Sequence, residues 1–402
     1  MKTNGKDTKL GVVPALRFPE FDNYWDIKEL SKIANLIKER ARNGNYTPMS
    51  VTSGVGLVSQ KEKFGRDISG NQYSSYFVIR KGDFAYNKSA TNLYPEGYIS
   101  MLKKLEIAAV PNSIFTCFKV NRKEVLPEYL DYLFENNYHG KWLRKFIEVG
   151  ARAHGSLSID TKKLFELPIV FPSINEQQKI ADCLSSIDAL IKATENKIDE
   201  LKAHKKGLMQ QLFPAEEKTV PILRFPEFQN AGEWKQTTIG AICTISNGKS
   251  NVQDNVQNGK YPLFDRSEII KASNKFLFDC EAIIIPGEGR FIPKYYIGKF
   301  DLHQRAYALK DFTSHALFVY HYITAFSFIL TQKAVKSTVL SLRMPILEAF
   351  PLLLPNIQEQ QKIANCLSSV DDLITAQTNR LEALRNHKKG LMQQLFPNID
   401  EC

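Results

Sequence analysis

One long phrase occurs twice in this chain, and an internal repeat of this kind constrains the fold more than any other feature. Residues 175–214 and 358–397 are identical at 27 of 40 aligned positions. A shorter phrase also recurs, as PALRFPEF at 14–21 and PILRFPEF at 221–228. The stretches between these phrases hardly resemble each other. A duplicated scaffold therefore carries two unlike inserts, which suits a protein that holds two different binding modules at a fixed geometry.

Each copy of the long phrase predicts one long helix. Apolar residues recur at alternating spacings of four and three, which is typical of a coiled-coil seam. Ser173 and Asn356 each stand three residues before a glutamate, the spacing of a capping box. The phrases end at Pro214 and Pro397, where a helix cannot easily continue. A helix of about 39 residues is about 58 Å long.

Neither helix can bury its apolar stripe alone, so we expect the two helices to pair in antiparallel orientation. Thr194, Gln377, Lys205 and Lys388 interrupt the stripe. Polar residues at such positions can specify register at a cost in stability, or the lysines can extend along the edge of the seam. The predicted seam residues are Ile180, Leu184, Ile187, Ile191, Ile198, Leu201, Leu208, Ile363, Leu367, Val370, Ile374, Leu381, Leu384 and Leu391.

The two inserts predict mixed globules, because short β-type runs alternate with helical stretches. The β-type runs are 76–80, 114–120, 282–286 and 307–310, and the helical stretches are 27–40, 127–134 and 317–332. We predict an α+β protein with two α/β-mixed domains, separated by two long repeated helices that form an antiparallel coiled coil with a pseudo-twofold internal repeat. The predicted boundaries are 1–172 and 214–354 for the domains, and 173–213 and 355–402 for the helices.

The net charge of +10 favours a polyanionic partner such as nucleic acid. The first residues lack the apolar core of a signal peptide, and the uncharged run 312–332 is too polar for a membrane span. We therefore expect a cytoplasmic protein that does not bind membranes. Six cysteines without a CxxC pair indicate neither a zinc site nor a disulfide framework, so no metal site is expected.

Catalytic motifs are absent from the sequence. Gly248, Lys249 and Ser250 resemble the end of a phosphate-binding loop, but Cys243 stands where that loop needs a glycine. The GEG at 287–289 is too short for a dinucleotide fingerprint. The sequence contains no HExxH motif and no recognisable catalytic constellation, so no catalytic residue is predicted.

Instead, basic and amide side chains lie in stretches that are predicted to be loops. Arginine and lysine read guanine and asparagine reads adenine in the major groove, although each can also hold only phosphate or face solvent. The candidate DNA-binding residues are Asn87, Lys88, Arg152, His154 and Ser156 in the first insert, and Arg266, Ser267, Arg290, Lys294 and Arg343 in the second.

The whole layout resembles the specificity subunit of type I restriction–modification systems. The resemblance is carried by LRFPEF, a following tryptophan at 25 or 234, and the phrases EQQKIADCLSSID, EQQKIANCLSSVD and GLMQQLFP, with YPLFDRSEI (261–269) and GKFDLHQRAYAL (298–309) in the second insert. It implies that the two inserts are target recognition domains, each reading one half of a bipartite, asymmetric DNA target. The repeated helices would be conserved spacers that set the distance between the half-sites and dock two methyltransferase subunits.

The same resemblance implies a non-catalytic, DNA-binding chain in a phage-defence complex. Partner subunits would supply adenine-specific DNA methylation with S-adenosylmethionine, and translocation and cleavage with ATP and Mg²⁺. The chain itself would bind no cofactor, and its partners would be double-stranded DNA, the modification subunits and restriction subunits.

The sequence leaves two alternatives, a coiled-coil interaction hub that does not read DNA and an enzyme with a disguised site. Changing the length of 175–212 by one heptad is expected to change only the gap, and exchanging residues 29–165 is expected to change only one half-site.

Overall fold

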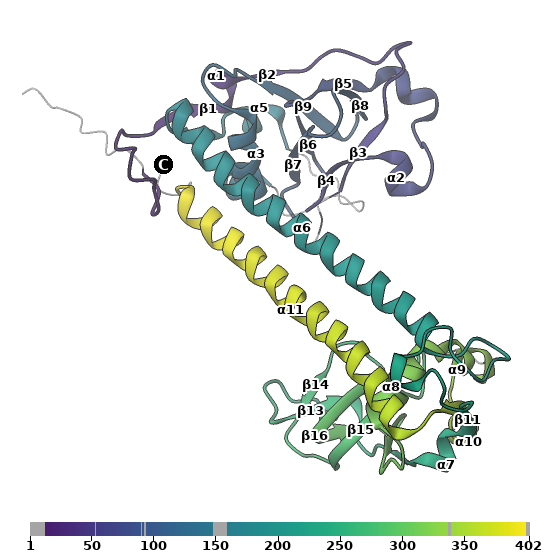
Figure 1. Cartoon of the computed structure of the whole chain (residues 1–402). Helices are drawn as coiled ribbons and strands as arrows, with labels where there is room; N and C mark the ends of the chain where they lie inside the picture. The colour runs from purple at the N-terminus through teal and green to yellow at the C-terminus, as the bar shows by residue number, and fades with distance from the viewer. Residues whose placement is uncertain are drawn as a thin grey trace, which may run out of the picture. The chain divides into compact units, whose positions relative to one another are not determined.

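The computed structural model describes residues 13–52, 54–89, 91, 94–147, 159–336 and 339–398. The chain forms two compact units (Figure 1). Unit 1 comprises Met1–Ala193 and Leu381–Cys402, and unit 2 comprises Thr194–Arg380. Because the boundaries fall inside the long helices, each unit contains one globule together with a part of both helices.

The repeated phrases form α6 (Ile174–Leu212) and α11 (Ile357–Leu395), each of 39 residues. At the start of α11, the Asn356 Oδ1 accepts a hydrogen bond from the Glu359 N–H at 2.9 Å, as the capping signal predicts. In unit 1 the first turns of α6 share a core with the last turns of α11. In unit 2 the last turns of α6 share a core with the first turns of α11. The two helices are therefore antiparallel within each unit.

The globule of unit 1 is built on a four-stranded antiparallel sheet in the order β2-β9-β6-β7, with three two-stranded pairs beside it. The sheet strands are β2 (Ala34–Leu36), β9 (Phe115–Val120), β6 (Phe84–Asn87) and β7 (Tyr98–Met101). The pairs are β1 (Asp26–Glu29) with β10 (Pro168–Phe171), β3 (Met49–Thr52) with β4 (Gly56–Ser59), and β5 (Phe77–Arg80) with β8 (Ile107–Val110). The short helices are α1 (Leu30–Ile33), α2 (Gln60–Phe64), α3 (Pro127–Glu135), α4 (Tyr138–Leu143) and α5 (Thr161–Phe165).

The globule of unit 2 is built on a six-stranded sheet in the order β12-β17-β15-β16-β13-β14. Its strands are β12 (Thr244–Asn247), β17 (Ala306–Lys310), β15 (Phe278–Pro286), β16 (Lys294–Leu302), β13 (Tyr261–Phe264) and β14 (Lys271–Ser273), and β11 (Lys235–Thr238) pairs separately with β18 (Pro351–Leu354). The helices are α7 (Ile239–Ile242), α8 (Ala316–Ala325), α9 (Ser327–Lys333) and α10 (Met344–Glu348). The two globules thus differ in their sheets, as the dissimilar inserts predict.

The repeated LRFPEF phrases attach each globule to the helices in the same way. Arg17 forms a bidentate ion pair with Glu176 in the first turn of α6, and Arg224 forms the same pair with Glu359 in α11. The backbone N–H of Leu16 donates to Gln394 in unit 1, as that of Leu223 does to Gln211 in unit 2. These contacts account for the repeated arginine and glutamate. The sheets of the two globules and the antiparallel helices α6 and α11 confirm the predicted fold class, an α+β chain with an internal repeat.

The predicted helical stretch 27–40 is wrong. The structure has β1, the single turn α1 and β2 in that order, with β1 paired to β10 and β2 paired to β9. Leu30 and Ile33 are fully buried, whereas Ile27 and Leu36 are exposed. Pairing with distant strands therefore overrides the local helical spacing. The predicted stretch 317–332 is helical but divides at Phe326 into α8 and α9.

The seam positions of α6 and α11 are buried or half-buried, with Ile180, Leu184, Ile363 and Leu367 almost fully covered. Thr194 is buried and Gln377 is half-buried. The lysines that interrupt the stripe are paired, because Lys205 contacts Asp371 at 2.6 Å in unit 2 and Lys388 contacts Asp188 at 2.7 Å in unit 1. The same lysine–aspartate contact therefore recurs at equivalent positions of the repeat.

Among the described residues each globule also buries one histidine, and we expect both histidines to make the protein sensitive to acid. Burial lowers the pKa of His321 to about 3 and that of His139 to about 4. The unfolded chain takes up a proton below about pH 6.5, whereas the folded chain stays neutral, so stability falls as the pH decreases from about 6.5 towards these values. The loss at pH 5 should be about 2 kcal/mol for each histidine. Urea unfolding of His321→Gln at pH 7 and pH 5 tests this.

His204 lies in α6 and is exposed, so His204→Gln is the matched control. We expect the pH dependence of stability to be weaker in His321→Gln than in His204→Gln. An equal pH dependence in both variants would contradict the assignment to His321.

Candidate nucleic-acid interface

Three loops of the unit 2 sheet bring basic side chains together. The loop 265–270 follows β13, the loop 287–293 joins β15 to β16, and the turn 303–305 joins β16 to β17. These loops meet because β13 and β15 both pair with β16, and because β15 also pairs with β17. Residues far apart in the sequence therefore share one surface.

Ion pairs connect the three loops. Arg290 contacts Glu268 at 2.7 Å, and Arg266 and Arg305 both contact Glu288, at 3.6 Å and 2.5 Å. The arginines project into solvent, so their guanidinium groups are accessible to a ligand. The Arg290–Glu268 pair is exposed on both sides and contributes little stability.

Lys294 is held more firmly than the arginines. Its Nζ donates to the Ser267 carbonyl oxygen at 2.5 Å and lies 6.0 Å from the centre of the Phe264 ring. Burial lowers the pKa of Lys294. Ser267 itself donates from both its N–H and its Oγ to Asp265 Oδ1, so the first turn of the loop is tied back to the sheet. Lys294 thus joins the loop 265–270 to the start of β16.

A groove with a volume of about 990 Å³ lies along these loops, lined by Lys202, Arg266, Ser267, Glu268, Pro286, Glu288, Gly289, Arg290, Ile292, Lys294 and Val339. Four of the candidate DNA-binding residues, Arg266, Ser267, Arg290 and Lys294, are among its lining residues. Arg343 is exposed at the start of α10 and is not among the described lining residues. Lys202, Glu288 and Arg305 were not predicted from the sequence. For Arg305 a signal existed, because it lies in the family phrase GKFDLHQRAYAL.

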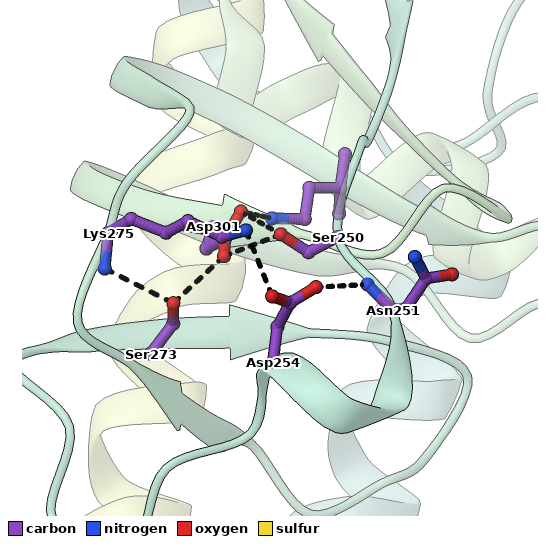
Figure 2. A network of polar contacts seen from close by, with 7 residues as sticks. Ser250, Asn251, Asp254, Ser273, Lys275 and Asp301 are labelled. Carbon is purple, nitrogen blue, oxygen red and sulfur yellow. Dashed lines mark hydrogen bonds and ion pairs between the residues drawn. The ribbon is translucent and has the colours of Figure 1, made fainter.

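A buried polar network supports this sheet from the side of β16 and β14. Figure 2 shows Asp301 between Ser250 and Ser273, and both hydroxyl groups donate to its carboxylate at 2.7–2.9 Å. The Leu302 N–H donates to the same carboxylate at 2.9 Å, which satisfies the buried charge. The network ties the loop after β12 to the strands that carry the basic loops (Figure 2).

The GKS segment at 248–250 is therefore structural in this fold. A Cβ atom at Gly248 would lie 2.2 Å from the Leu302 carbonyl oxygen, so only glycine allows this close approach of two backbone segments. Ser250 uses its hydroxyl group to hold Asp301, as Figure 2 shows. This agrees with the conclusion from the sequence that the segment is not a phosphate-binding loop.

The candidates in unit 1 are less gathered. Asn87 is buried at the end of β6, and its Oδ1 accepts a hydrogen bond from the Ser89 N–H at 2.9 Å. Lys88 is half-buried, and its backbone N–H donates to the Ile114 carbonyl oxygen. The other three candidates, Arg152, His154 and Ser156, lie outside the described residues. For unit 1 the assignment of DNA-binding residues stays a prediction.

Within the part of the chain that the structure describes, no group of three or more histidine, cysteine or acidic side chains could hold a metal ion. In the same residues, no helix is long and apolar enough to span a membrane.

Comparison with known proteins identifies the family. The sequence profile of the type I restriction modification DNA specificity domain matches this chain twice, at residues 24–203 and 231–386. The two matches cover most of the chain and contain one globule each. The chain therefore belongs to the family of type I restriction modification DNA specificity domains.

Individual relatives agree with this assignment. The chain is 29% identical over 166 residues to the type I restriction enzyme EcoDI specificity subunit of Escherichia coli, a match that covers 41% of this chain and 37% of that protein. It is 26% identical over 331 residues to the MjaVIII specificity subunit of Methanocaldococcus jannaschii, covering 70% and 72%. The structure resembles the crystal structure of the S subunit of a type I restriction-modification system from M. genitalium, with a TM-score of 0.62, 15% identity, and coverage of 96% and 99%.

Proposed function

We propose that this chain is the non-catalytic specificity subunit of a type I restriction–modification complex, and that each of its two globules reads one half of a bipartite, asymmetric DNA target. The observation that carries the proposal is the basic groove of unit 2, where Arg266, Arg290 and Lys294 converge from separate loops. Membership in the family supplies the functional context. We assign residues 1–172 and 214–354 as the recognition domains, and 173–213 and 355–402 as the spacer helices.

The chemistry of the groove suits duplex DNA. Exposed guanidinium groups can form bidentate hydrogen bonds to the O6 and N7 atoms of guanine, and lysines can neutralise phosphates. The net charge of +10 favours association with any duplex, while contacts to base edges provide the sequence preference. Two globules with different sheets then require two different half-sites, so the target is not a palindrome.

We expect the paired helices to set the gap between the two half-sites. Readers on one face of a duplex favour half-sites about one helical turn apart, roughly 34–36 Å. Lys205–Asp371 and Lys388–Asp188 hold the helices in a single register within each unit, and we therefore expect helix length to set the gap between the half-sites.

We further propose that two methyltransferase subunits dock on this chain and that restriction subunits join the same core. In unit 2 a cavity of about 710 Å³ supports a docking role, because Met209, Phe213 and Pro214 of the repeated GLMQQLFP phrase line it. The partners would bring S-adenosylmethionine, ATP and Mg²⁺, and would flip the target adenine out of the duplex. A cytoplasmic location follows from this role.

A comparison of methylomes tests the function directly. Cells with and without this gene, both containing the methyltransferase subunit, are sequenced for modified adenines. We expect deletion to remove one bipartite adenine-methylated motif. If the methylome is unchanged although the chain is expressed, the reading of DNA is refuted and a coiled-coil interaction hub remains.

Exchanging one globule should change one half of that motif. Replacing residues 29–165 by the corresponding insert of a relative removes all described contacts of the first sheet but leaves α6, α11 and the second globule intact. We expect a new sequence in one half-site, with the other half and the gap unchanged. A change in both halves would contradict independent reading by the two globules.

A further inference from the structure

Glu288 has an unusual place in the basic groove of unit 2. Its carboxylate lies between Arg305 at 2.5 Å and Arg266 at 3.6 Å, two arginines that come from different loops. The Glu288 side chain is 17% exposed, whereas those of Arg266 and Arg305 are 66% and 63% exposed. A mostly covered carboxylate therefore holds two arginines whose outer parts face solvent.

The backbone fixes the position of this carboxylate. On one side the Gly287 N–H donates to the Arg305 carbonyl oxygen at 2.8 Å, and on the other the Gly289 N–H donates to the Leu340 carbonyl oxygen at 2.9 Å. A Cβ atom at residue 287 would lie 2.5 Å from the Arg305 oxygen, and Gly289 has a φ of +80°. The GEG segment is thus shaped to present Glu288 at one point of the groove.

We propose that Glu288 is a positioning residue that determines sequence specificity in the second half-site. It orients Arg266 and Arg305 as one pair that presents guanidinium groups to guanine edges. This inference rests on the proposed reading of DNA by the 214–354 domain and names a residue that controls it.

The physical reason has two parts. Holding an arginine in the bound geometry before association reduces the conformational entropy lost on binding, which favours the one arrangement of bases that fits it. A fixed negative charge beside the arginines also opposes phosphate groups, which carry a full charge, more than base edges, which carry only partial charges. Glu288 therefore favours base contacts over phosphate contacts by the same two arginines.

The variant Glu288→Gln keeps the size of the side chain and removes its charge. We expect tighter binding to unrelated duplex DNA, and a salt dependence steeper by about 0.9 in log–log slope, equivalent to about one additional phosphate contact. We expect the preference for the target over a scrambled duplex to decrease about tenfold, the value of one well-placed bidentate contact.

Glu268 offers a matched control in the same groove. It pairs with Arg290 at 2.7 Å, but both side chains are largely in solvent, at 70% and 78% exposure. Glu268→Gln also removes one negative charge from the groove, but it leaves the mostly buried Glu288 carboxylate in contact with its two arginines. We expect a similar change in salt dependence and a smaller loss of target preference than in Glu288→Gln, because the exposed Glu268 contacts one arginine and not two. Equal losses of preference in both variants would show that only net charge matters, and the inference would be overturned.

The experiment uses the full chain together with the modification subunit. The methylome of cells carrying each variant gives the motif, and duplexes with the target or a scrambled sequence give the binding preference over a range of salt concentrations. The inference is supported if Glu288→Gln relaxes the sequence requirement only in the half-site that stays unchanged when residues 29–165 are exchanged. An unchanged half-site in folded Glu288→Gln overturns it, whereas the lack of any bipartite motif with the parent chain refutes the proposed function instead.

If Glu288→Gln does not fold, Arg305→Lys tests whether the arginines held by Glu288 determine the sequence of this half-site. This variant keeps the charge of the groove but cannot make bidentate contacts. We expect the same half-site to relax, with the salt dependence unchanged. A folded Arg305→Lys protein that retains the parent motif would overturn the inference.

Discussion

Deleting one heptad from α6 alone is expected to destabilise the protein by about 3–5 kcal/mol where it leaves the largely buried Lys205 without Asp371. The cost is smaller where it separates Lys388 from Asp188, because Lys388 keeps Glu135 at 2.6 Å. Asp188 and Lys205 are 17 residues apart in α6, as are Asp371 and Lys388 in α11. Deletion of residues 193–199 shortens the spacing between Asp188 and Lys205 and leaves that between Asp371 and Lys388 unchanged. The Lys205–Asp371 and Lys388–Asp188 pairs can then no longer form together. Hydrogen exchange measured by mass spectrometry on the full chain should show which unit loses protection.

The matched variant also deletes residues 376–382, the equivalent heptad of α11. Both spacings are then equal again, and we expect stability close to that of the parent chain. A heptad is about 10.5 Å of helix, or about three base pairs. The methylated motif should therefore have a gap shorter by about three base pairs with both half-sequences unchanged. If deletion in α6 alone gives the same stability and the same new gap as the paired deletion, the two ion pairs do not set the register.

The structure changes the expected effect of removing one heptad. From the repeat alone, one heptad removed from 175–212 is expected to change only the gap. The structure shows why both helices have to change, because each unit pairs residues from α6 with residues from α11.

Replacing Arg224 by alanine is expected to destabilise unit 2 by about 3–5 kcal/mol, because it leaves the Glu359 carboxylate buried without its ion pair. The Arg224 and Glu359 side chains are only 7% and 1% exposed, and two hydrogen bonds of 2.7 Å join them. Arg224 also donates to the Ala231 carbonyl oxygen, so its loss removes a second contact that holds the LRFPEF segment in place.

Trp234 can report this loss in the full chain. The chain has three tryptophans, and Trp25 and Trp142 belong to unit 1, so changing those two to phenylalanine leaves a fluorescence signal from unit 2. Denaturant unfolding of Arg224→Ala in this background measures the effect. We expect the double variant Arg224→Met with Glu359→Leu to recover much of the stability, because no buried charge is left without a partner.

Lys362→Ala is the matched control for Arg224→Ala. Lys362 lies one turn further along α11 and pairs with Glu227 of the same LRFPEF phrase at 3.0 Å, but these side chains are 52% and 45% exposed. An exposed pair contributes at most about 1 kcal/mol. If Arg224→Ala costs no more than Lys362→Ala, the buried pair does not hold the segment to the helix.

The long helices could be predicted from the sequence because their signals are local. A heptad pattern, a capping residue and a terminal proline act within a few residues, and the chain repeats all of them at 175–214 and 358–397. The helical prediction for 27–40 failed because strand pairing is not local. Its apolar residues fit a helical period, but β1 and β2 bind to strands that lie far away in the sequence.

The repeat by itself thus established the duplicated architecture. The rest of the sequence lacked a recognisable catalytic motif and contained candidate basic residues, but it did not show how these residues are grouped. The grouping of Arg266, Arg290 and Lys294 with Glu288 and Arg305 depends on which strands are neighbours in the six-stranded sheet. The repeat also did not reveal that Lys205 and Lys388 each pair with an aspartate at the equivalent position of the opposite helix. Helix register depends on contacts between residues more than a hundred positions apart. Strand order depends on pairing between residues such as Thr244 and Lys310 or Leu263 and Asp301, and a pattern of neighbouring residues encodes neither.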